Sequence, residues 1–313
     1  MEERRVDQEQ SGFGTVQTRS TPALNPATVE LLEQAWVVRQ QRHSPVLTMV
    51  KPHQTLAVSV TGGHCDLQCR HCDGHYLRAM TPVGQALDTY LSRSFSSCLI
   101  SGGCQSNGTV PVVQHEDVLL KLRKAGARLN CHVGVCDAPQ AKRLSSLVDC
   151  VSFDLVGDDE TLGEVYGVGH AVEKLWESFL RLSDEITTYP HICIGLRGGR
   201  ISGEYAVLKR LEDMSLPAVV FLILIPTPNT AYAECAPPSL DEVARFLARA
   251  RLQLPKVPLF LGCMRPAGRY RALVDELAVR AGIQKIVKPM PAAVRWAQRA
   301  GLDVRIQKEC CVL

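Results

Sequence analysis

The stretch TLAVSVTGGHCDLQCRHCDGHY, residues 55–76, carries the features that decide the fold. It opens with a short apolar run, Leu56–Val60, of the kind that forms a buried strand. A Gly-Gly turn then leads into a loop that holds Cys65, Cys69 and Cys72. The pattern predicts a strand whose carboxyl end presents three closely spaced thiols.

Downstream of this stretch, short β-branched runs alternate with amphipathic segments. The predicted strands are Leu56–Val60, Ser97–Ser101, Arg128–Val133, Cys150–Leu155, His191–Leu196, Ala218–Ile225, Pro258–Gly262 and Lys285–Lys288. The predicted helices include Asp117–Lys124, Ala138–Leu147, Val172–Leu182, Glu204–Met214, Leu240–Arg251, Tyr270–Ala281 and Ala292–Ala300. Because strands and helices alternate over a span close to the roughly 250 residues of such a fold, we expect an α/β protein with a TIM-type (β/α)8 barrel.

No linker interrupts this alternating region, so the sequence predicts one domain with short extensions. Residues 1–26 are polar and are expected to form a flexible tail. Residues 27–54 are expected to form a helix and a lead-in, residues 55–300 the barrel, and residues 301–313 a tail that ends in a Cys-Cys pair.

The composition excludes several classes of protein. The 313 residues are 46% apolar, and 35 Lys and Arg oppose 32 Asp and Glu, which gives no electrostatic case for binding nucleic acid. The longest apolar run, Ala218–Ile225, is too short to span a membrane, and the first residues lack the apolar core of a signal peptide. We therefore expect a cytoplasmic protein, in which its 13 cysteines stay reduced.

The spacing C-x3-C-x2-C of Cys65, Cys69 and Cys72 is typical of ligands to a metal group. Three thiolates can hold three irons of a [4Fe–4S] cube and leave the fourth iron open to a small ligand. The alternative is a zinc site, in which a histidine completes the three thiolates. The histidines within reach in the sequence are His64, His71 and His75.

This spacing, placed after the first strand of a predicted barrel, resembles the radical S-adenosylmethionine (radical SAM) superfamily. His71 occupies the position before the third cysteine where that family usually has an aromatic ring. The resemblance implies a [4Fe–4S] cluster on Cys65, Cys69 and Cys72 that binds the amine and carboxylate of SAM. It also implies a ferredoxin- or flavodoxin-type reductant and cleavage of SAM to methionine and a 5′-deoxyadenosyl radical, which takes a hydrogen atom from the substrate.

The second predicted strand ends in Ser101-Gly102-Gly103-Cys104. Radical SAM enzymes commonly have Gly-Gly-Glu here, where the backbone and the carboxylate receive the amino group of SAM. Because Cys104 replaces the glutamate, the resemblance implies that the backbone of Ser101–Gly103 recognises the amine. A Gly-Gly pair alone would indicate only a turn.

Two further residues are candidates for SAM contacts by resemblance to biotin synthase. Asp154, at the end of the fourth predicted strand, would accept hydrogen bonds from the ribose hydroxyls. Arg197, after the fifth, would bind the SAM carboxylate. A solvated surface arginine is the alternative for Arg197, and helix capping is the alternative for the nearby Asp158 and Asp159.

The other cysteines suggest a second metal group. Cys104, Cys131 and Cys193 follow or lie in strands where biotin synthase carries ligands of a second cluster, and an arginine ligand there corresponds to the region of Arg265. The terminal pair is expected to fold over the open, carboxyl end of the barrel. The predicted ligands of an auxiliary [4Fe–4S] cluster, with Cys193 in reserve, are Cys104, Cys263, Cys310 and Cys311. The alternative for the tail is a C-a-a-X prenylation signal.

Taken together, these motifs resemble a biotin-synthase-related group that includes one component of the two-protein lipoyl synthases. The resemblance implies that sulfur is inserted into an octanoyl chain on a lipoyl-carrier protein, and that a second radical SAM protein adds the other sulfur. One alternative is a different radical SAM reaction, in which the extra cluster relays electrons or anchors substrate. Another is an iron–sulfur binding protein that cleaves no SAM.

Overall fold

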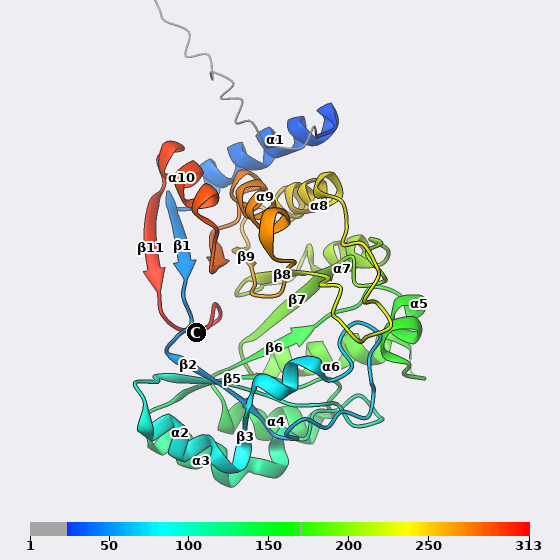
Figure 1. Cartoon of the computed structure of the whole chain (residues 1–313), viewed down its shortest axis with the longest axis vertical. Coiled ribbons are helices and arrows are strands. Elements are labelled where there is room, and N and C mark those ends of the chain that lie inside the picture. The colour runs from blue at the N-terminus through cyan, green and yellow to red at the C-terminus, as the bar shows by residue number, and fades with distance from the viewer. Residues whose placement is uncertain (1–23, 170) are drawn as a thin grey trace, which may run out of the picture.

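The computed structural model of the chain describes residues 24–169 and 171–313. The predicted tail over residues 1–26 lies outside the described residues, apart from its last three. The described chain forms one curled sheet with helices packed on its outer face (Figure 1). This arrangement confirms the predicted α/β class.

The sheet has 11 strands in the order β11-β1-β10-β9-β8-β7-β6-β5-β4-β2-β3. All of its pairings are parallel. The strands are β1 (Val46–Val50), β2 (Thr55–Ser59), β3 (Thr81–Pro82), β4 (Ser97–Ser101), β5 (Arg128–His132), β6 (Cys150–Asp154), β7 (Thr188–Ile194), β8 (Val219–Ile223), β9 (Leu259–Leu261), β10 (Lys285–Val287) and β11 (Asp303–Gln307).

The eight predicted strands correspond to β2 and β4 to β10, and three more strands extend the sheet at its edges. The sheet is open: in the described chain no pairing joins β10 to β2. Instead β1 pairs with β10 and β11, and residues 51–54 lead directly from β1 into β2, which pairs with β4. We call this interruption beside residues 51–54 the seam; it faces left in Figure 1.

The helices cover the outer face of the sheet, and none in the described ranges is long and apolar enough to cross a membrane. The α helices are α1 (Pro26–Arg42), α2 (Ala86–Ser92), α3 (Glu116–Lys124), α4 (Ala138–Leu147), α5 (Asp159–Thr161), α6 (Val172–Glu185), α7 (Glu204–Leu211), α8 (Leu240–Gln253), α9 (Gly268–Arg280) and α10 (Pro291–Arg299). Short 3-10 turns span His75–Ala79, Val83–Gln85 and Val112–His115, and a π-helical turn, η4, spans Leu162–Tyr166.

Alternation along each strand separates an outer core from the lumen of the curled sheet. In β6, Val151 and Phe153 pack in the outer core beneath the helices. Cys150 instead packs with the lumen side chains, and Ser152 hydrogen-bonds Asn130 of β5. Polar and thiol side chains therefore line part of the lumen, while the outer core is apolar.

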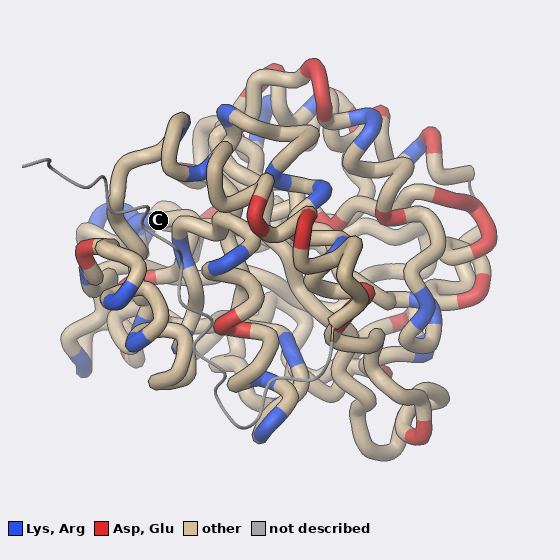
Figure 2. Tube along the Cα trace, turned by 90° about the horizontal axis from the view of Figure 1, so that it is seen from above, with Lys and Arg blue, Asp and Glu red and all other residues tan. Residues whose placement is uncertain are grey.

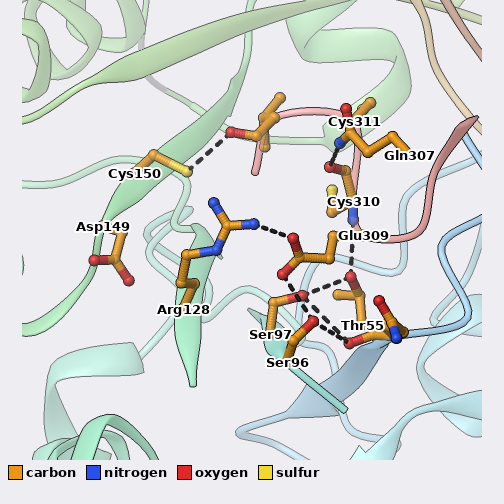
Figure 3. Close-up of polar contacts among 12 residues, drawn as sticks. Thr55, Ser96, Ser97, Arg128, Asp149, Cys150, Gln307, Glu309, Cys310 and Cys311 are labelled. Carbon is orange, nitrogen blue, oxygen red and sulfur yellow. Dashed lines mark hydrogen bonds and ion pairs between the residues drawn. The ribbon is translucent and has the colours of Figure 1, made fainter. Parts of the chain in front are cut away.

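The segment after β11 turns into the lumen from the amino ends of the strands (Figures 1 and 3). Cys310 N–H donates to Oγ1 of Thr55 at the start of β2, over 2.8 Å. Nζ of Lys285, at the start of β10, donates to the Cys311 carbonyl over 2.6 Å. The expectation that this tail covers the carboxyl end of the barrel was therefore wrong, because its contacts lie at the opposite end.

Candidate functional site

The three-cysteine loop follows β2 and is fixed by backbone hydrogen bonds to three other segments. Asp66 N–H donates to the Cys104 carbonyl after β4, over 2.9 Å. Arg70 N–H donates to the Val165 carbonyl of η4 over 2.9 Å, and the Arg70 carbonyl accepts from Tyr232 N–H. The loop is held at the carboxyl end of the sheet, where barrel enzymes carry their reactive groups.

Gly103 allows the end of β4 to touch this loop. A Cβ atom at Gly103 would lie 1.9 Å from the His64 carbonyl oxygen and 2.6 Å from Cys65 Cα. The Gly103 N–H donates to Oγ1 of Thr61 over 2.7 Å. The Gly-Gly pair therefore does more than form a turn: it brings the predicted amine-binding backbone against the first cysteine.

The thiols of the loop share one electrostatic environment with Cys104. A hydrogen bond from Cys69 lowers the pKa of Cys72 to about 4, although burial opposes the shift, and His71 adds to the lowering. The same hydrogen bond, together with burial and the charges of Cys72, Cys104 and Cys65, raises the pKa of Cys69. One thiolate thus forms readily among four neighbouring thiols.

The cysteine loop does not surround a single ion position in the described structure. No three Cys, His, Asp or Glu side chains in residues 24–169 and 171–313 converge on one ion position. Zinc needs its ligands around a single centre, whereas the thiolates of a cluster bind different irons and lie farther apart. In addition, Nδ1 of His71 is buried with no hydrogen-bond partner among the described residues, which leaves a polar atom of the loop for a bound group.

A cavity of about 150 Å³ lies beside the loop. Among the residues that line it are Ser101, Gly102, Cys104, His132, Asp154 and Tyr166. The structure thus brings three of the predicted SAM-binding residues, from the ends of β4 and β6, to one cavity. Tyr166 belongs to η4, and such π-helical turns are frequent at functional sites.

Asp154 is paired with a histidine that the sequence analysis missed. Its Oδ2 lies 3.5 Å from Nδ1 of His132, at the end of β5. Burial disfavours the charged form of Asp154, but the hydrogen bond and positive charge of His132 outweigh it and lower the pKa of Asp154 to about 2. His191 of β7 stacks edge-on against His132 at 5.1 Å. Its position near the carboxyl end of the predicted strand Arg128–Val133 could have identified His132 as a candidate site residue.

Arg197 is placed differently from the prediction. Its Nε donates to Oε2 of Glu164 over 2.6 Å, and its Nη2 pairs with Glu160. Glu164 also accepts a hydrogen bond from the Tyr232 hydroxyl. Because two carboxylates already bind the guanidinium, the pairing favours a structural role for Arg197 over the predicted contact with the SAM carboxylate.

The predicted auxiliary ligands fall into two places. Cys104 lies with the first loop, Cys310 and Cys311 pack with the lumen cluster, and the exposed Cys263 is near enough to interact with their charges. Asn130 Nδ2 contacts Sγ of Cys310 at 3.8 Å, and a hydrogen bond from Cys311 lowers the pKa of Cys310 to about 6.

The nearby arginine does not join this lumen group. Arg265 is 2% exposed, and its Nε donates to Oδ1 of Asp275 in α9 over 2.6 Å. Its Nη2 donates to the Val287 carbonyl over 2.7 Å. The guanidinium is therefore engaged by α9 and β10 rather than offered as a ligand.

Neither a scan against protein-family models nor a search of the curated proteins found a match. Among solved structures, the chain is similar to HydG, a maturase of the [FeFe]-hydrogenase, with 16% identity, a TM-score of 0.65, and coverage of 90% of this chain and 69% of that one. It is also similar to methylornithine synthase (PylB), with 12% identity, a TM-score of 0.65, and coverage of 92% and 91%. A third is SuiB of Streptococcus suis bound to S-adenosylmethionine, with 12% identity, a TM-score of 0.52, and coverage of 76% and 58%. At these identities the likeness shows a shared fold.

Proposed function

We propose that this protein is a radical SAM enzyme that holds a [4Fe–4S] cluster on Cys65, Cys69 and Cys72. The observation that carries the proposal is the placement of these thiols at the carboxyl end of β2, against Gly103. A cavity lined by polar groups of neighbouring strand ends adjoins them. The fold shared with SuiB, whose structure holds SAM, supports the same proposal.

When bound, the cluster and SAM supply the 5′-deoxyadenosyl radical that takes hydrogen from an unactivated carbon. The chain's own residues position the SAM. The ionised Asp154 would accept hydrogen bonds from the ribose hydroxyls, with His132 fixing its orientation. Burial raises the pKa of Cys104 to about 12, so this residue stays neutral where related enzymes carry a glutamate. Amine recognition would then rest on backbone carbonyls of Ser101–Gly103.

For the substrate, we propose an octanoyl chain on a lipoyl-carrier protein, with a second radical SAM protein as partner. The lumen contains an apolar cluster that includes Val220, Phe260 and Val287, and side chains of this kind would contact a hydrocarbon chain. The thiols of Cys310 and Cys311 lie in the same lumen and, together with the nearby Cys263, would hold a sulfur-donating auxiliary cluster.

The first test is SAM cleavage. Anaerobically reconstituted protein is incubated with SAM and dithionite, and 5′-deoxyadenosine is quantified by chromatography. We expect product from the wild type and none from the Cys65/Cys69/Cys72 triple alanine variant. Product at background level in the wild type would instead indicate an iron–sulfur binding protein.

The second test addresses the reaction. An octanoyl-lysyl peptide is added together with the partner protein, and the peptide is examined by mass spectrometry. We expect a mass gain that corresponds to sulfur. Formation of 5′-deoxyadenosine without sulfur transfer would favour a different radical SAM reaction.

A further inference from the structure

Charge is distributed unevenly over the chain. Residues 254–313 contain 11 Lys and Arg against 4 Asp and Glu, whereas residues 137–242 contain 8 against 17. In Figure 2 many acidic residues lie along the side away from the chain end, and others lie elsewhere. The near-neutral total therefore conceals a basic part and an acidic part.

Four basic side chains border the seam, two from residues 51–53 and two from the basic part, and we call them the basic rim. Lys51, His53 and Lys288, with two prolines, line an open cavity of about 390 Å³. Lys308 joins them because its carbonyl accepts from Gln54 N–H over 3.0 Å. All four side chains are exposed.

Among the described residues, the three lysines of the rim, Lys51, Lys288 and Lys308, form no ion pair, whereas some cations elsewhere on the surface do. Arg143 binds Glu116, and Arg210 binds Glu173 over 2.6 Å. The positive potential at the seam is therefore not neutralised from within the chain, and it would attract an anionic surface.

The rim adjoins the lumen. Val50 and Val287, which directly precede Lys51 and Lys288, pack in the lumen cluster. A partner on the rim would sit beside the apolar cluster that we propose to contact the acyl chain.

We propose that the basic rim is the docking surface for an acidic face of the carrier protein that bears the acyl chain. This inference rests on the proposed function, because a chain tethered to a protein reaches the lumen only if its carrier docks beside an entrance. The seam is where the strand pairing is interrupted, and the rim supplies complementary charge there. Rim charges of this kind accelerate association and orient the partner.

The test is charge reversal at the rim with a matched control. The triple variant Lys51→Glu, Lys288→Glu, Lys308→Glu is compared with Lys124→Glu, Lys142→Glu, Lys174→Glu, which changes exposed lysines on α3, α4 and α6. Binding of an octanoylated lipoyl-carrier protein is measured by calorimetry at several salt concentrations. For the rim variant we expect a Kd about tenfold or more above that of the wild type and a weaker dependence of Kd on salt. Each exposed ion pair with the carrier contributes a small increment, and reversing the three charges adds repulsion. The control should stay near the wild-type value.

Other outcomes distinguish an error in the proposed docking surface from an error in the proposed substrate. Iron content and SAM cleavage without substrate should be unchanged in both variants, which shows that both fold. If the wild type binds no carrier protein, the proposed substrate is wrong. If it binds and the rim variant binds equally well, the substrate stands and the docking surface is wrong. The inference would also be overturned if the rim variant lost binding to phosphatidylserine vesicles but kept its binding to the carrier protein, since the rim would then face a membrane.

Discussion

At the scale of single residues, Gly103 controls how closely β4 approaches the cysteine loop. In Gly103→Ala the new Cβ would collide with the backbone of His64 and Cys65, so the loop must move. We expect destabilisation of about 1–3 kcal/mol and a severalfold loss of reconstituted iron. Iron analysis beside circular dichroism checks this, with Gly63→Ala as the control, because no atom lies within 4 Å of a Cβ there. Full iron retention in Gly103→Ala would contradict the proposed packing.

Asp154 gives a second prediction at this scale. Asp154→Asn removes the negative charge that faces His132 and weakens the acceptor proposed for the ribose. Hydrogen bonds to charged groups contribute about 1.5–3 kcal/mol, so the KM for SAM should rise about tenfold or more. Steady-state 5′-deoxyadenosine formation measures it, and Asp303→Asn on the exposed β11 serves as the control. An unchanged KM would remove Asp154 from the SAM site.

Residues that are close in sequence were easier to predict than residues brought together by the fold. The spacing of Cys65, Cys69 and Cys72 lies within one loop, so a local pattern identifies it. Arg197 is bound by carboxylates more than thirty residues earlier in the chain, and no local pattern indicates that pairing. The same holds for Cys104, which joins the first loop because β4 pairs with β2.

At the scale of elements, the eight predicted strands are present because each is a short apolar or β-branched run. Of the strands missed, β1 (VLTMV) is itself an apolar run within the predicted lead-in, whereas β11 carries a weaker signal. β11 is largely exposed and contains Asp303, Arg305 and Gln307, so its composition is that of a surface segment. It is a strand because β1 offers it a parallel edge from Val46 to Val50. Pairing with a distant strand, not local preference, determines this element.

The end of α1 provides a prediction on pH dependence. His43 follows α1 and lies 2.8 Å from Nη1 of Arg251 in α8, and burial and that positive charge lower the pKa of His43 from 6.5 to about 4. Between these values the unfolded chain binds the proton more readily than the folded one, so stability is complete above pH 6.5 and falls as the pH drops toward 4. We expect a loss of about 1 kcal/mol by pH 5, reduced by partial solvent screening. Urea titrations at pH 7 and 5 check it, and His43→Gln should show a smaller difference.

The ion pair of Arg265 and Asp275 gives another test of element packing. Both side chains are fully buried, and the pair ties the segment after β9 to α9. Asp275→Asn leaves the arginine without its counter-charge, which should cost about 3–5 kcal/mol of unfolding free energy. Thermal denaturation monitored by circular dichroism measures it, beside Asp303→Asn. A near-native melting temperature would show that the carbonyl partners of Arg265 suffice.

For the whole molecule, the open sheet and the inserted segment belong together. In Figure 3, Glu309 pairs with Arg128 and accepts from Oγ of Ser96 over 2.9 Å. These contacts seat residues 308–313 against the starts of β4 and β5, and bring Cys310 and Cys311 into the lumen. The sequence identified a Cys-Cys tail but led us to expect it at the wrong end of the barrel, because its position depends on the pairing of β11 with β1.

A second cluster can form only if the inserted tail brings its two cysteines near Cys263, so the iron content reports on the arrangement of the whole chain. If Cys263, Cys310 and Cys311 hold a second cluster, reconstituted wild-type protein should bind about eight irons per chain and show broad visible absorption. The Cys65/Cys69/Cys72 triple alanine variant and the Cys263/Cys310/Cys311 triple alanine variant should each retain about four. Because the two thiol groups lie in different places, each variant should lose one cluster and leave the other intact. If the second variant keeps all the wild-type iron, the lumen thiols hold no cluster, and sulfur for the proposed reaction must come from elsewhere.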